Sequence, residues 1–257
     1  DSGGGIRVNN HALAEIQDNL VAYNQADGGG GIAVIDNSIA TITSNRVLSN
    51  AVVDGDGAGV LVDSSVVTVT NNIIGLNEGL SIAWLGDGIF VRGSNSDVQV
   101  VNNTIVSNSA EGIEAHWGTT VLARNNIIYG NDGGIHNYQS GATVSSDHNA
   151  FWNNGWDYEN VTRGTGDISG DPLFVDAANG DYHLQAGSPC IDSGTPGGAP
   201  STDIEGTPRD ANPDIGAFEW AGCQIFLPLV VRSAGAQESL TLPLESGCEL
   251  YNPTLCG

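Results

Sequence analysis

Residues of several reactive types follow three glycine–aliphatic pairs, Gly88-Ile89, Gly112-Ile113 and Gly134-Ile135, at two fixed offsets. The residues at the first offset are Phe90, Glu114 and His136, and those at the second are Arg92, His116 and Tyr138. If the three segments are neighbouring strands with the aliphatic residues pointing inward, these side chains share one outward face. Such a face binds a glycan if aromatic rings stack on the sugar and Arg92 pairs with a carboxylate.

Two other interpretations of this face remain open. In a polysaccharide lyase, Arg92, His116 or Tyr138 would remove a proton next to a uronate carboxylate. In the interpretation that we prefer, the face is a solvated flank that carries ordinary surface residues. Trp117 and Trp84 are expected near the same face.

Acidic residues precede the same glycine–aliphatic pairs, in glycine-rich turns. They are Asp27, Asp54, Asp56, Asp87, Glu111 and Asp132. Stacked turns of this kind offer the carboxylate and carbonyl oxygens that Ca²⁺ prefers, with Asp54, Asp56 and Asp87 as the best trio. Aspartate also favours such turns for its local hydrogen bonds alone, and this explanation is equally good.

The candidate residues belong to a sequence repeat that is marked by asparagines. A pair of asparagines spaced five residues apart recurs six times. The first members are Asn19, Asn45, Asn72, Asn103, Asn126 and Asn149, and the second members are Asn24, Asn50, Asn77, Asn108, Asn131 and Asn154. A glycine–aliphatic pair stands upstream of each, with 22 to 29 residues between successive pairs. This is a repeat in which strands are fixed in length and loops vary.

Each repeat contains three short runs of alternating apolar and polar residues, which predict three short strands. Three strands per repeat of about 25 residues are typical of one coil of a parallel β-helix, with coils about 4.8 Å apart. We expect the first asparagine of each pair to turn the chain and to donate to its equivalent in the next coil, as an asparagine ladder. The pattern resembles the right-handed parallel β-helix repeat of the pectate-lyase-like superfamily over residues 3–155. The predicted fold is therefore all-β, a right-handed parallel β-helix of about six or more three-strand coils with a β-rich, disulfide-containing C-terminal cap or tail.

Three parts are expected: coils over residues 1–155, a terminating module over 156–221, and a strand-like tail over 222–257. The module resembles the choice-of-anchor Q segment of secreted bacterial proteins, through Gly170–Phe174, Gly187-Ser188-Pro189, Asp192, Asp203, Arg209, Asp214-Ile215-Gly216 and Glu219. This resemblance implies a secreted or surface protein and no reaction. We expect Arg209 to be a structural partner for one of the carboxylates of Asp203, Asp214 or Glu219.

The composition limits the partners and the compartment. The formal net charge is −23, with seven basic residues that are all arginine, so binding to nucleic acid or to an acidic membrane surface is excluded. No apolar run approaches the roughly 20 residues of a membrane span. The four cysteines, Cys190, Cys223, Cys248 and Cys256, suggest two disulfides in an extracellular, oxidising environment, although their connectivity is open. The chain begins at Asp1, which suggests processing of a longer precursor.

Three functional classes remain. We prefer a non-catalytic extracellular structural or surface protein that assembles head-to-tail into filaments, because the first coil has no cap and the strand-like tail could cover it in a neighbouring copy. The second class is an adhesin that binds extracellular polysaccharide through the face described above. A polysaccharide lyase or glycoside hydrolase is the third. It is disfavoured because neither the paired aspartates of β-helix glycosidases nor the calcium-plus-arginine pattern of pectate lyases is found.

Overall fold

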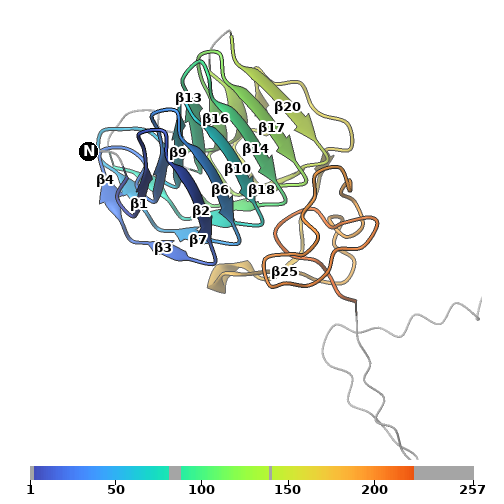
Figure 1. The fold of residues 1–257 in the computed structure, drawn as a ribbon. Coiled ribbons are helices and arrows are strands. Elements are labelled where there is room, and N and C mark those ends of the chain that lie inside the picture. The colour runs from blue at the N-terminus through green and yellow to red at the C-terminus, as the bar shows by residue number, and fades with distance from the viewer. Residues whose placement is uncertain (1–2, 81–87, 139–140, 223–257) are drawn as a thin grey trace, which may run out of the picture.

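The chain forms a right-handed parallel β-solenoid of about six turns, seen in a computed structural model that describes residues 3–80, 88–138 and 141–222 (Figure 1). The first sheet contains β1 (Ile6–Val8), β5 (Ile32–Val34), β9 (Val60–Asp63), β13 (Ile89–Arg92), β16 (Glu111–Ala115), β19 (Gly133–Asn137) and β22 (Tyr158–Glu159). The second contains β2 (Leu13–Gln17), β6 (Ile39–Thr43), β10 (Val66–Thr70), β14 (Asp97–Val101), β17 (Thr120–Arg124) and β20 (Thr143–Asp147). The third contains β3 (Leu20–Ala22), β7 (Arg46–Leu48), β11 (Ile73–Gly75), β15 (Thr104–Val106), β18 (Ile127–Tyr129), β21 (Ala150–Trp152) and β23 (Ile168–Ser169).

The prediction of a parallel β-helix is thus confirmed, with two corrections. The first three coils have a fourth strand each, namely β4 (Gln25–Ala26), β8 (Ala51–Val52) and β12 (Glu78–Gly79). These strands are two residues long, too short to show an alternating pattern in the sequence. Parallel pairing also continues past residue 155, because β22 pairs with β19 and β23 pairs with β21. The asparagine repeat does not mark this last partial turn, because Asp167 replaces asparagine at the ladder position of the turn.

The interior is a continuous column of aliphatic side chains, one or more from every coil. Ile42, Ile74, Ile105 and Ile128 are fully buried, and Phe151 closes the column with 1% of its surface exposed. Period-2 alternation explains this column, because every second side chain of a strand points into the solenoid.

Two asparagine ladders run along the coils at the corners that flank the third sheet. In the first, the Nδ2 atom of Asn45 donates to Oδ1 of Asn72 at 3.0 Å, and Asn72 donates in turn to Asn103 at 2.9 Å. The ladder ends where Asn149 donates to Oδ1 of Asp167 at 3.2 Å. The second ladder, formed by the other member of each pair, repeats this pattern from Asn24 to Asn154. These amides satisfy backbone groups that the corners would otherwise leave unpaired.

The C-terminal segment from residue 171 to 222 packs along the side of the solenoid, and the disulfide-containing cap or tail expected from the sequence remains a prediction. It contains the antiparallel strands β24 (Phe174–Asp176) and β25 (Asp181–Leu184), joined by the short 3₁₀ helix η1 (Ala177–Asn179). Its apolar residues pack on outward side chains of the third sheet; the cluster includes Ile73, Val106, Ile127 and Ala150 from the sheet and Phe174, Leu184, Ile215 and Phe218 from the segment. Figure 1 shows the segment in orange beside the coils.

Polar contacts hold this lateral segment at the outer asparagines of the corners. Asn102 donates to the carbonyl of Asp214 at 2.9 Å, and Asn71 donates to the carbonyl of Thr202 at 2.7 Å. Arg209 pairs with Glu219 at 2.9 Å and donates to Asn71 at 3.1 Å, with 2% of the arginine side chain exposed. The structural role expected for Arg209 is therefore present.

Cys190 is the one cysteine within the described residues, and its side chain is fully buried. Burial raises the pKa of its thiol to about 12. Cys223, Cys248, Cys256 and the strands expected in the tail lie outside the described residues, so the disulfides remain a prediction. Within residues 3–80, 88–138 and 141–222, no helix has the length and apolar character needed to cross a membrane.

Candidate functional site

The two columns of reactive residues meet on the outer face of the first sheet. Phe90 is the register partner of Glu114, and Glu114 is the register partner of His136, in β13, β16 and β19. One step along the strands, the ring of His116 stacks on that of Tyr138 with centroids 4.4 Å apart and planes 10° from parallel. The regular stacking of coils thus places residues from three repeats next to one another.

The face is not a solvated flank, and the interpretation preferred from the sequence was wrong on this point. Phe90 and Glu114 are each 2% exposed, His116 is 7% exposed and His136 is 8% exposed. Phe90 packs with Leu61 and Ala33, and the turns at Gly29 and Gly57 approach Leu61 so closely that an added Cβ would come within 3.2 Å of it. Side chains of neighbouring coils and glycine-rich turns therefore remove these four side chains from water, an effect that strand periodicity does not reveal. Arg92 and Tyr138, on the same face, stay partly exposed.

Glu114 and His116 form the centre of the cluster. Nε2 of His116 lies 2.5 Å from Oε1 of Glu114, and both side chains are buried. The His116 ring also contacts Phe90, at a centroid distance of 4.8 Å, and the edge of Trp117 at the same distance. A buried carboxylate requires such a hydrogen-bonding partner, because desolvation without one is costly.

Two aromatic side chains at the cluster remain open to solvent. Tyr138 is 41% exposed and Trp117 is 51% exposed, and both contact the buried His116 ring. Trp117 adopts a positive φ of 40°, a conformation that non-glycine residues seldom take. The two rings form an exposed aromatic surface over a buried polar cluster.

Arg92 is committed to two aspartates within the protein. Its Nε atom lies 2.8 Å from Oδ2 of Asp63, and its Nη1 atom pairs with Asp56. Burial raises the pKa of Asp56 above its ordinary value, and the charge of Arg92 acts in the opposite direction. Arg92 is therefore poorly placed to bind a ligand carboxylate or to remove a proton.

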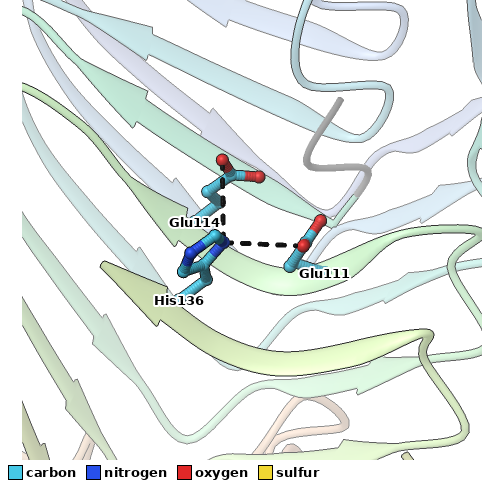
Figure 2. A group of neighbouring side chains, drawn as sticks. All are labelled: Glu111, Glu114 and His136. Atoms are coloured by element: carbon cyan, nitrogen blue, oxygen red, sulfur yellow. Dashed lines mark ion pairs between the residues drawn. The ribbon is translucent and has the colours of Figure 1, made fainter. Parts of the chain in front are cut away.

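The calcium trio expected from the sequence is described only in part and stays a prediction. Asp56 contacts Arg92, Asp54 is exposed, and Asp87 lies outside the described residues, as does Trp84. A different group could hold a cation: one ligand atom each from Glu111, Glu114 and His136, all within 4.8 Å of one another (Figure 2). The sequence placed Glu111 only among the acidic turn residues and did not connect it with the histidines.

The comparison with known families agrees with this architecture. A family model described as a right-handed β-helix region matches residues 2–170. The chain belongs to this family. No curated protein matches the chain. The right-handed β-helix match includes the partial last turn formed by β22 and β23, and all residues of the cluster lie within it. The match leaves the choice-of-anchor Q resemblance of the lateral segment without support.

A second histidine cluster lies on the lateral segment, and its hydrogen bonds are complete. Nδ1 of His183 lies 2.6 Å from Asp181, and Nε2 lies 3.2 Å from Glu205. Burial lowers the pKa of His183, but the hydrogen bonds that these two carboxylates accept from the ring outweigh it, so the net shift is upward. Both ring nitrogens are used, and this group has the geometry of a surface ion-pair network.

Proposed function

We propose that this β-helix protein binds a neutral extracellular polysaccharide on the outer face of its first sheet. The observation that carries the proposal is the exposed pair Trp117 and Tyr138, at 51% and 41% exposure, held by contacts with the buried His116. Aromatic rings with one apolar face and fixed orientation are the side chains that stack on sugar rings. The stacking on His116 limits the motion of Tyr138, which lowers the entropy cost of binding.

The charge of this face favours a neutral glycan over a polyuronate. Arg92 is neutralised by Asp56 and Asp63, and the remaining charged neighbours include Glu111, Glu114 and Glu159. The whole chain carries a formal net charge of −23. A polyanion would be repelled by this surface, whereas a neutral sugar could contact the aromatic rings without that cost.

Burial of Glu114 favours binding over cleavage. A glycosidase needs two carboxyl groups that flank the scissile bond and touch it. Glu114 is 2% exposed and its Oε1 atom is already bonded to His116, so it does not reach a sugar on the surface. We therefore propose a binding protein and not a hydrolase or a lyase.

Affinity electrophoresis with soluble neutral glycans and with polygalacturonate tests this proposal. We expect a retarded band for the wild type with at least one neutral glycan and none with polygalacturonate. Trp117→Ala and Tyr138→Ala should each weaken binding by about tenfold or more, which corresponds to about 1.4 kcal/mol. Trp152, which is 43% exposed on the third sheet, provides the matched control Trp152→Ala.

Two results would overturn the binding proposal. One is a wild-type protein that recognises only polyuronates. The other is that Trp117→Ala and Tyr138→Ala bind the glycan with the same affinity as the control variant Trp152→Ala. New reducing ends or unsaturated products from the bound glycan would instead show an enzyme.

Assembly into filaments is a second candidate, favoured by the first coil. Leu13, Leu20 and Tyr23 are 83%, 69% and 85% exposed there, beside a hollow lined by Gly5, Ile6, Asn19, Leu20, Val21, Ala22 and Asn24. Both ladders donate away from this coil, so the Oδ1 atoms of Asn19 and Asn24 are oriented to accept from another strand. We propose a second copy of the chain as the occupant. Electron microscopy of concentrated wild-type protein and of Leu20→Glu tests this: filaments lost in the variant support it, and monomers in both refute it.

A further inference from the structure

We propose that Glu111, Glu114 and His136 bind one divalent transition-metal ion of the zinc class. The three residues come from two adjacent strands, β16 and β19, and Glu114 and His136 are register partners. Figure 2 shows the two carboxylates and the imidazole converging from these strands. This site lies beneath the exposed aromatic surface, because the ring of His136 contacts that of Tyr138 at a centroid distance of 5.5 Å. The inference does not depend on glycan binding.

The first argument is an unused nitrogen. The His136 side chain is only 10% exposed, and its Nδ1 atom is buried without a hydrogen-bond partner among the described residues. A nitrogen that is buried without a partner gives up its hydrogen bond to water, and this loss destabilises the fold. Buried polar atoms are therefore rarely left without a partner. His183 shows the contrast, because both of its nitrogens contact carboxylates within 3.2 Å. The orphaned Nδ1 atom therefore points to a missing ligand.

The second argument is the spacing around this nitrogen. Nδ1 of His136 lies 3.6 Å from Oε1 of Glu111 and 3.9 Å from Oε1 of Glu114. Two ligand atoms bound tetrahedrally to zinc at about 2.0–2.1 Å are separated by roughly 3.4 Å. Both separations are within about half an ångström of this value, and all three ligand atoms lie within 4.8 Å of one another. The same separations are too long for direct hydrogen bonds, which need 2.7–3.2 Å.

The third argument is the surrounding shell. Glu114 accepts from His116 at 2.5 Å and still has its second oxygen and further lone pairs for a metal. Nε2 of His136 lies 3.8 Å from Oε2 of Glu159, on the side opposite the proposed ligand atom. Metal-binding histidines characteristically direct their other nitrogen at a carboxylate, and metal-binding carboxylates are themselves hydrogen-bonded. Glu114 has this hydrogen bond, and the carboxylate of Glu159 faces the other nitrogen of His136 at a distance beyond a direct hydrogen bond.

The donor set selects the class of ion. Ca²⁺ and Mg²⁺ prefer all-oxygen sites, whereas an imidazole with two carboxylates suits Zn²⁺ and its neighbours in the first transition series. Three protein ligands leave a fourth position for water or for an oxygen of a ligand. The bound cation would also offset the negative charge of this acidic face, which lacks lysine entirely.

Equilibrium dialysis with Zn²⁺ and titration with Co²⁺ test the inference on the intact protein. We expect one Zn²⁺ per chain and the visible absorption of tetrahedral Co²⁺. Glu111→Gln and His136→Gln should weaken binding by more than about 100-fold, because each removes a ligand, and Glu159→Gln should weaken it by about 10-fold as an outer-shell change. Glu78→Gln and His183→Gln are controls of the same type away from the site, and should bind as the wild type does.

The inference fails if the wild type binds no Zn²⁺, or if His183→Gln removes the ion while His136→Gln keeps it. If His136→Gln does not fold, Glu111→Gln decides, because Glu111 is only partly buried and its replacement keeps the shape of the side chain. Zinc binding that is normal in Glu111→Gln also overturns the site. Loss of zinc with unchanged glycan affinity would separate this inference from the proposed function.

Discussion

Replacement of Asn72 by alanine should destabilise the solenoid strongly, because Asn72 lies in the middle of the first ladder. Its side chain is fully buried. Oδ1 accepts from the backbone N–H of Asn45 at 2.8 Å and from the Asn45 amide at 3.0 Å. Nδ2 donates to the carbonyl of Ile42 and to Oδ1 of Asn103, each at 2.9 Å. The groups that alanine would leave unpaired are buried away from the protein surface.

The expected loss follows from these contacts. Each buried donor or acceptor left without a partner costs about 1–3 kcal/mol, and two or three are orphaned here. We therefore expect a loss of about 4 kcal/mol in the free energy of unfolding, or roughly 10 °C in Tm for a chain of this size. Asn19 offers the matched control, because it is in the same ladder but exposed, so water replaces its contacts. Asn19→Ala should cost less than about 1 kcal/mol.

Guanidinium denaturation followed by circular dichroism measures both variants. Asn72→Asp adds a sharper comparison, because it keeps the acceptor for Asn45 but turns a carboxylate oxygen toward the carbonyl of Ile42. Aspartate is suited to the end of the ladder, where the second oxygen of Asp167 accepts from Ser146, Tyr158 and Gly164. Asn72→Asp should therefore be at least as destabilising as Asn72→Ala. An Asn72→Ala variant no less stable than Asn19→Ala would refute the role given to the ladder.

Two further predictions concern the lateral segment. Arg209→Met should cost about 3–5 kcal/mol and expose residues 171–222 to limited proteolysis, because it removes the cation beside the buried Glu219 carboxylate and leaves it only its backbone N–H donors. Arg46→Met, which breaks an exposed pair with Glu205 at 3.9 Å, should change little, and equal protease resistance of the two variants would contradict this. Burial raises the pKa of Asp214 from 3.8 to about 6, although the N–H groups of Asp192 and Trp220 act in the opposite direction. A raised carboxyl pKa stabilises the fold below pH 3.8 and loses that contribution as pH rises through 6, so the Tm of the wild type relative to Asp214→Asn should increase from pH 7 to pH 4. A flat or falling difference would show that Asp214 is not the titrating group.

The fold could be predicted from the sequence because each coil repeats the same local rules. Alternation fixed which residues point inward, and the paired asparagines marked the corners. The lateral packing could not be predicted. Ile73 and Ile74 are adjacent and equally apolar, but Ile74 faces the interior while Ile73 contacts the C-terminal segment. Two adjacent apolar residues in the sequence do not show that the outward one is covered by a distant segment of the chain.

The candidate site was predicted in part. The repeat offsets correctly placed Glu114 beside His136 and His116 beside Tyr138. The burial of these residues depends on how turns from neighbouring coils fold over the sheet, and local periodicity contains no such information. Arg92 was expected to bind a ligand because its two partners in the protein were overlooked. These partners, Asp56 and Asp63, come from the preceding coil and its loop, which are distant in the sequence. Glu111 was missed because it begins a strand at a corner, where its side chain turns toward His136.

Oxidative footprinting by mass spectrometry tests the central claim, that the outer face of the first sheet is the binding surface. The protein is oxidised with and without the neutral glycan that retards it, and modification is read at each exposed aromatic residue. Our account predicts protection of Trp117 and Tyr138, with Trp152 and Trp220 modified equally in both samples. Protection of Trp152 or Trp220, with Trp117 and Tyr138 unchanged, would contradict it.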